Sequence, residues 1–174
     1  MNTGQSIGII PARYASTRFP GKPLALIGGK TMIRRVYEQS SLALEHVVVA
    51  TDDERIAAEV KSFGGAVCLT SPEHGSGTDR CAEALEIYSR ETGSQYKIVV
   101  NIQGDEPFIH PDQIREILDC FNQEGTRIAT LARVATRSDE LFNPNQPKVV
   151  VNARNEALLF SRSPIPYLRN LPRE

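Results

Sequence analysis

The sequence predicts an α/β fold in which helices cover both faces of a mostly parallel sheet. Short, nearly continuous apolar runs at 7–10 and 46–50 are typical of strands that are buried on both faces. Segments with apolar residues at helical spacing follow these runs. The alternation continues along most of the chain, and such alternation is characteristic of parallel sheets. Because ligands of these sheets bind beyond the carboxyl ends of the strands, we expect the functional residues there.

Each element is predicted by its own local pattern. Ile33, Val36 and Ser40 recur at helical spacing after the first strand. Gly64-Gly65 is a typical end for the second helix, and Pro111 is typical of the first turn of the fourth. The predicted strands cover 7–10, 46–50, 66–69, 96–102 and 128–134, and the predicted helices cover 31–43, 52–63, 78–91 and 111–121.

Composition narrows the class of protein. The chain has 174 residues, the length of one domain, and its 40% apolar and 24% charged residues are ordinary for a globular protein. A net charge of −1 gives no general basic field that would favour nucleic acid or a membrane surface. No stretch approaches the roughly 20 apolar residues of a membrane span, and no signal-peptide pattern follows Met1. Cys68, Cys81 and Cys120 lack metal-site spacing, so we expect reduced, mostly buried thiols in a cytoplasmic protein.

A basic loop follows the first strand, in the stretch IGIIPARYASTRFPGK. Arg13, Arg18 and Lys22 place three cations within ten positions, and the small residues between them allow close approach of a ligand to the backbone. The loop therefore either holds a strongly anionic ligand such as a triphosphate or is a solvated connection between a strand and a helix. It matches neither the Walker A spacing nor the G-x-G-x-x-G fingerprint.

The segment TSPEHGSGTDR follows the third strand and begins a helix. Ser76 or Thr78 is expected to cap this helix, and the residues alone favour that structural role. Alternatively, His74 and Gly77 stand where the free N–H groups of the helix could meet a base or a phosphate, and Arg80 could lean over the same pocket. His74 is a candidate hydrogen-bonding residue, because no second histidine stands at metal-ligand spacing.

Two further segments follow predicted strands. Asp52 and Asp53 follow the second strand, and we expect this pair to cap the next helix without a catalytic role. The strand in VVNIQGDEP runs directly into Gln103 and Asp105. Asp105 is a candidate Mg²⁺ ligand, because Mg²⁺ commonly binds one or two carboxylates together with substrate phosphates. The alternative is that Asp105 and Glu106 only start a turn before a proline.

Several motifs resemble those of the 3-deoxy-manno-octulosonate (Kdo) cytidylyltransferases, the CMP-Kdo synthetases of Gram-negative bacteria. They are PARYASTRFPGKPL, HGSGTDR, VNIQGDEP and LFSRSPIP. The resemblance implies a Rossmann-like nucleotidyltransferase (nucleotide-diphospho-sugar transferase) fold. It also implies transfer of CMP from CTP to Kdo, with release of pyrophosphate, for lipopolysaccharide biosynthesis. The implied roles are triphosphate binding by Arg13 and Lys22 with help from Arg18, nucleotide binding by His74, Ser76, Gly77, Thr78 and Arg80, contacts with the sugar acid by Gln103 and Arg162, and Mg²⁺ binding by Asp105.

The resemblance covers the chain from Ile7 to about Tyr167, but family members continue well beyond Glu174. We therefore expect a single nucleotidyltransferase domain over 1–174 that is truncated at its C-terminus. In the family the later portion brings a second metal-binding Asp and much of the contact in a homodimer. If the polypeptide were complete at this length, we would expect nucleotide binding with weak or absent turnover.

Two alternative functions remain open at this point. One is a cytidylyltransferase for another acidic sugar such as a sialic acid, although those relatives carry a differently spaced Arg–Lys loop. The other is a catalytically silent nucleotide-binding module. A metal-dependent glycosyltransferase is disfavoured, because Asp105-Glu106-Pro107 is not a D-x-D arrangement.

Overall fold

The structure is a computed structural model that describes residues 5–15, 19–167 and 169. The chain forms two compact units, one up to Ala129 and the other from Thr130 onward. Among the residues that the structure describes, none of the helices combines the length and the apolar character that a membrane span requires.

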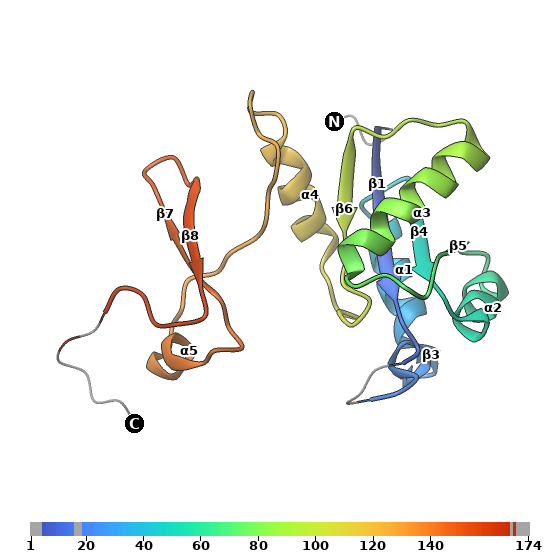
Figure 1. Cartoon of the computed structure of the whole chain (residues 1–174), viewed down its shortest axis with the longest axis horizontal. Helices are drawn as coiled ribbons and strands as arrows, with labels where there is room; N and C mark the ends of the chain where they lie inside the picture. Colours follow the sequence, from blue (N-terminus) through green and yellow to red (C-terminus); the bar gives the residue numbers. More distant parts are fainter. Residues whose placement is uncertain (1–4, 16–18, 168, 170–174) are drawn as a thin grey trace. The chain divides into compact units, whose positions relative to one another are not determined.

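The first unit is built on a four-stranded sheet in which all paired strands are parallel (Figure 1). Its strands are β1 (Ser6–Ala12), β4 (His46–Thr51), β5 (Ala66–Leu69) and β6 (Ile98–Asn101). They lie in the order β5–β4–β1–β6, so β1 is central and pairs with β4 on one side and β6 on the other. This arrangement brings the carboxyl ends of all four strands to one edge of the sheet.

Helices cover both faces of this sheet, as the sequence predicts. The helices are α1 (Met32–Ser41), α2 (Glu54–Ser62), α3 (Gly77–Thr92) and α4 (Pro111–Cys120). Alternate residues of β1 point to opposite faces, which gives the sheet two separate cores. Ile9 belongs to a buried cluster with Ala84 of α3. Ile10 belongs to a second cluster with Ile33 of α1 and Ile114 of α4. The predicted α/β class is confirmed.

The predicted helix starts agree closely with the structure because side chains cap them. Ser76 Oγ accepts a hydrogen bond from the Asp79 N–H at 3.1 Å. Asp53 Oδ1 accepts from the Arg55 N–H at 3.0 Å. His110 and Gln113 form a capping box before α4. Three short elements between β1 and α1 were not predicted from the sequence. They are a 3₁₀ turn (Lys22–Leu24) and the paired strands β2 (Leu26–Ile27) and β3 (Lys30–Thr31).

The second unit contains a short helix and a hairpin, α5 (Ser138–Phe142), β7 (Lys148–Val151) and β8 (Ala157–Ser161). The two strands pair antiparallel. Arg133 and Glu140 form an ion pair in this unit, and the hydrogen bond from Arg133 lowers the pKa of Glu140 to about 2. Lys148 Nζ donates to the carbonyl oxygens of Asn143 and Arg162, each at 2.9 Å.

The predicted strand at 128–134 is wrong, because this segment has no strand structure. Its apolar residues fit the strand pattern, but a strand needs a hydrogen-bonded neighbour, and the described backbone pairs none with this segment. Ile128 is 91% exposed and Val134 is 83% exposed. The expectation of mostly buried thiols is confirmed, since Cys68 and Cys81 are buried and Cys120 is exposed. Burial raises the pKa of both buried thiols to about 11.

Candidate functional site

A cavity of about 340 Å³ lies in the first unit, at the edge of the sheet where its parallel strands end. Three segments that follow β1, β5 and β6 meet around it, although they are far apart in the sequence. Six residues that the sequence analysis singled out line this cavity, namely Arg13, Lys22, Ser76, Gly77, Gln103 and Asp105. The remaining lining residues are Pro11, Ala12, Pro23, Gly75 and Gly104.

A backbone hydrogen bond between the two ends of the basic loop brings Lys22 back to the cavity. The Gly21 N–H donates to the Tyr14 carbonyl oxygen at 2.9 Å. Gly21 has a φ of 73°, and a Cβ there would come within 3.1 Å of the Tyr14 ring. The Arg55 guanidinium lies 3.3 Å from the centroid of the same ring, a cation–π contact. These contacts fix the backbone just before Lys22.

Arg13 is held by the segment that precedes α3. Its Nη2 donates a hydrogen bond to the His74 carbonyl oxygen. The His74 ring pairs through Nε2 with the Glu83 carboxylate. Glu83 also accepts from the Ser71 N–H at 2.8 Å. The hydrogen bond from His74, assisted by that from Ser71, lowers the pKa of Glu83.

His74 therefore shapes the loop, and its ring is already engaged by Glu83. Glu83 was not predicted from the sequence, because nothing in the motif shows that the ring of His74 pairs with a residue of α3. Its position two turns along α3 from Ser76 is the only signal that could have drawn attention to it.

Lys22 and Asp105 form an ion pair across the cavity. Lys22 Nζ lies 2.7 Å from Asp105 Oδ2, and the two side chains are 36% and 52% exposed. They come from loops that are 83 residues apart in the sequence. The residue proposed to hold phosphate and the residue proposed to hold metal thus neutralise each other in this structure.

The N-terminus of α3 forms the third wall of the cavity. Ser76 caps the helix, and a Cβ on Gly77 would lie 3.4 Å from Pro11 Cγ. The close approach of Gly77 to the end of β1 brings the free N–H groups of the first helical turn to the cavity. Such groups favour anionic ligands.

Gly104 is required where the loop after β6 crosses the end of β1. A Cβ at this position would lie 2.9 Å from the Pro11 carbonyl oxygen, a backbone atom that cannot rotate away. We expect Gly104→Ala to lower the free energy of unfolding by about 1–3 kcal/mol, because the added methyl must displace one of the two loops. Denaturant unfolding measures this loss.

Gly75→Ala is the matched control, since Gly75 lines the same cavity and its added Cβ would meet nothing within 4 Å. Its free energy of unfolding should change by no more than about 0.5 kcal/mol. Equal stability losses in the two variants would contradict the close approach at Gly104.

The donor set for a metal contains one carboxylate at this cavity. The described residues include no group of three or more His, Cys, Asp or Glu side chains that could hold a metal ion. Asp105 alone fits Mg²⁺ only if nucleotide phosphates and water supply the other ligands, which is a common arrangement for this ion. Its half-exposed carboxylate is accessible for that purpose.

Four of the other predicted site residues that the structure describes, His74, Thr78, Arg80 and Arg162, do not line the cavity. Arg80 is fully buried, and Thr78 is exposed on the first turn of α3. Arg162 belongs to the second unit, where its Nη1 donates to the Pro144 carbonyl oxygen at 2.8 Å. Arg18 lies outside the described residues.

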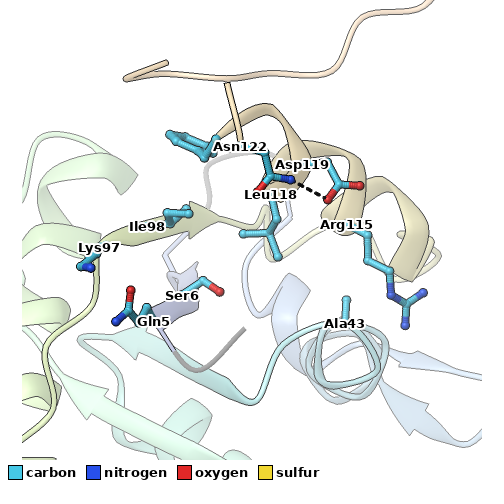
Figure 2. Close-up of a pocket in the computed structure, with 10 residues that line it drawn as sticks. Gln5, Ser6, Ala43, Lys97, Ile98, Arg115, Leu118, Asp119 and Asn122 are labelled. Atoms are coloured by element: carbon cyan, nitrogen blue, oxygen red, sulfur yellow. Dashed lines mark hydrogen bonds between the residues drawn. The ribbon is translucent and has the colours of Figure 1, made fainter. Parts of the chain in front are cut away.

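A second cavity, of about 360 Å³, lies at the opposite edge of the sheet (Figure 2). It is formed by the starts of β1 and β6 and by the C-terminal half of α4, with Ser6, Ile98 and Leu118 among its lining residues. Within the described ranges, none of the site residues predicted from the sequence lines this second cavity. The convergence of six of them on the other cavity marks that cavity as the candidate functional site.

A parallel sheet whose C-terminal edge combines a basic loop, a helix N-terminus and a carboxylate is typical of α/β proteins that bind phosphate-containing ligands, the nucleotidyltransferases among them. Comparison with known proteins specifies the family. A model of the cytidylyltransferase family matches residues 7–174. The chain belongs to this family.

Individual relatives agree with this assignment. The 3-deoxy-manno-octulosonate cytidylyltransferase of Parabacteroides distasonis is 60% identical over 167 residues, which cover 94% of this chain and 65% of that protein. The enzyme of the same name from Bacteroides thetaiotaomicron is 56% identical and covers 97% of this chain and 67% of its own length. The chain spans about two thirds of the length of the curated relatives that it matches.

A solved structure is also similar. The structure of CMP:2-keto-3-deoxy-manno-octonic acid synthetase complexed with CTP superposes with a TM-score of 0.82 at 40% identity, covering 95% of this chain and 67% of that one. The family resemblance and the Rossmann-like nucleotidyltransferase fold predicted from the sequence are confirmed.

Proposed function

We propose that this chain binds CTP in the cavity between the basic loop, α3 and Asp105, and that the whole protein transfers CMP to Kdo with release of pyrophosphate. The observation that carries the proposal is the convergence of six predicted residues on one cavity. The similar structure that is complexed with CTP, and relatives that are named for Kdo, support the choice of substrates.

The residues at the cavity suit each part of such a reaction. Arg13 and Lys22 provide cationic donors for the triphosphate, and the N–H groups at Gly77 provide further donors for an anion. Gln103 provides an amide that can contact the sugar acid. When bound at Asp105, Mg²⁺ would supply charge neutralisation at the phosphates and lower the pKa of the attacking hydroxyl. The chain contributes chiefly orientation and electrostatic stabilisation, which dominate phosphoryl-type transfers.

The proposal extends to residues and properties outside this cavity. Arg162 would meet the carboxylate of the sugar acid, because a guanidinium binds a planar carboxylate by two parallel hydrogen bonds. We further propose one nucleotidyltransferase domain that includes both compact units, a homodimer of the whole protein, and a cytoplasmic location where CTP is available.

Two measurements test the proposal in sequence. Titration of the chain with CTP, with and without Mg²⁺, should show saturable binding that ATP does not reproduce. Pyrophosphate release by the whole protein should then require Kdo when it is assayed across a panel of sugar acids. If a sialic acid supported faster pyrophosphate release than Kdo, that sialic acid would take the place of Kdo as the proposed substrate. Absence of CTP binding would overturn the whole proposal.

A further inference from the structure

The two adjacent carboxylates that follow β4 have different surroundings, although the sequence gives them the same expected role. Asp53 caps α2 and pairs with the exposed Arg55. Asp52 makes no capping hydrogen bond with α2. Its Oδ1 lies 3.3 Å from Nη1 of Arg80. The side chains of Asp52 and Asp53 are similarly buried, at 23% and 18% exposed, so the difference between them lies in their partners.

Arg80 is the largest fully buried side chain that the structure describes. Its Nη1 donates to Thr70 Oγ1 at 2.6 Å. Its Nε and Nη2 have no hydrogen-bond partner among the described residues. A fully buried guanidinium is costly unless an opposite charge lies close by. Asp52 is the carboxylate that forms an ion pair with Arg80, and its Oδ1 has no hydrogen-bond partner among the described residues, so this contact is electrostatic. Glu83 also interacts electrostatically with Arg80.

This pair joins three elements that meet at the C-terminal edge of the sheet. Asp52 follows β4, Thr70 follows β5, and Arg80 stands in the first turn of α3. The Thr70 N–H also donates to the Thr51 carbonyl oxygen at 2.9 Å, which connects the ends of the two strands directly. Through the buried Arg80 side chain, the first turn of α3 therefore contacts the residues that follow both strands.

We propose that Asp52 is a positioning residue of the nucleotide site, which acts through Arg80. By holding the Arg80 guanidinium, the Asp52 carboxylate fixes the first turn of α3, so that Ser76 and Gly77 face the cavity that they line. Neither Asp52 nor Arg80 lines that cavity. The inference rests on the proposed binding of CTP, and it assigns to Asp52 a role that its neighbour Asp53 does not share.

The test compares Asp52→Asn with Asp53→Asn in the full chain. Both changes remove one carboxylate charge, from adjacent positions, and both leave an amide of the same shape. We expect Asp52→Asn to raise the dissociation constant for CTP about tenfold or more, because an unbalanced buried guanidinium displaces the first turn of α3. Asp53→Asn should weaken the capping of α2 but change the CTP dissociation constant by less than about twofold.

A double variant separates positioning from a general loss of stability. In Asp52→Asn/Arg80→Gln, both charges are absent, so no unbalanced charge stays buried. We expect this variant to fold and to bind CTP more tightly than Asp52→Asn but less tightly than the wild type. Wild-type affinity in either the double variant or Asp52→Asn would overturn the inference while leaving the proposed function intact.

Hydrogen exchange tests the same inference without a ligand. The Asp79 and Arg80 N–H groups donate to Ser76 in the first turn of α3. They should exchange faster in Asp52→Asn than in Asp53→Asn. Equal exchange in the two variants would show that Asp52 does not hold α3, whether or not the protein binds CTP. Failure of the wild type to bind CTP would overturn the proposed function, which is a separate outcome.

Discussion

Lys22→Ala should weaken CTP binding by roughly 10- to 150-fold, the cost of losing a hydrogen bond to a charged group worth about 1.5–3 kcal/mol. Lys22 is the cation that reaches across the cavity to Asp105, and its side chain is 36% exposed, so a ligand phosphate can replace that carboxylate. In the whole protein, turnover should fall by orders of magnitude, because the same charge would stabilise the departing pyrophosphate. Calorimetric titration with CTP and a pyrophosphate-release assay measure the two effects.

Lys30→Ala is the matched control for this prediction. Lys30 pairs with Glu38 at 2.7 Å with similar exposure, and it does not line the cavity. Its removal should leave CTP affinity unchanged within about twofold, because an exposed ion pair contributes at most about 1 kcal/mol to folding and nothing to this site. Equal losses in the two variants would indicate a general charge effect in place of a phosphate contact at Lys22.

The fold was predictable from sequence because its elements depend on local patterns. The strands in the centre of the sheet are buried on both faces, so their continuous apolar runs distinguish them clearly from the helices. Capping side chains such as Ser76 mark where helices begin. The segment 128–134 has the same apolar character, but strand formation also depends on a neighbouring backbone that sequence alone does not reveal.

The sequence was sufficient to predict which segments meet at the candidate site. Parallel strands place their carboxyl ends at one edge, so Arg13, Gln103 and Asp105 were expected to converge there, and they do. The direction of individual side chains was not predictable. Asp52 and Asp53 are alike in sequence, yet one faces a buried Arg80 and the other caps a helix. Such differences depend on contacts between residues that are distant in the chain.

Asp105→Asn should change CTP binding in opposite directions with and without metal. Without metal, the wild-type carboxylate competes with phosphate for Lys22, which it contacts at 2.7 Å. Asparagine keeps the shape but removes the charge, so Lys22 becomes available. Because an exposed ion pair is worth about 0.2–1 kcal/mol, metal-free CTP should bind up to about fivefold more tightly than in the wild type.

With Mg²⁺ present, Asp105→Asn should lose most of the metal-dependent gain in CTP affinity, because the only carboxylate among the described residues that line this cavity has been replaced by a neutral amide. For the same reason, turnover of the whole protein should fall by about a hundredfold or more. Glu106→Gln is the control, because it removes the same charge from the adjacent position, and Glu106 does not line the cavity. Calorimetric titrations in EDTA and in Mg²⁺ separate the two regimes. A uniform loss of affinity in both buffers would mean that Asp105 contacts the nucleotide directly, whereas a gain in EDTA alone would establish that Lys22 and Asp105 restrain each other until nucleotide and metal arrive.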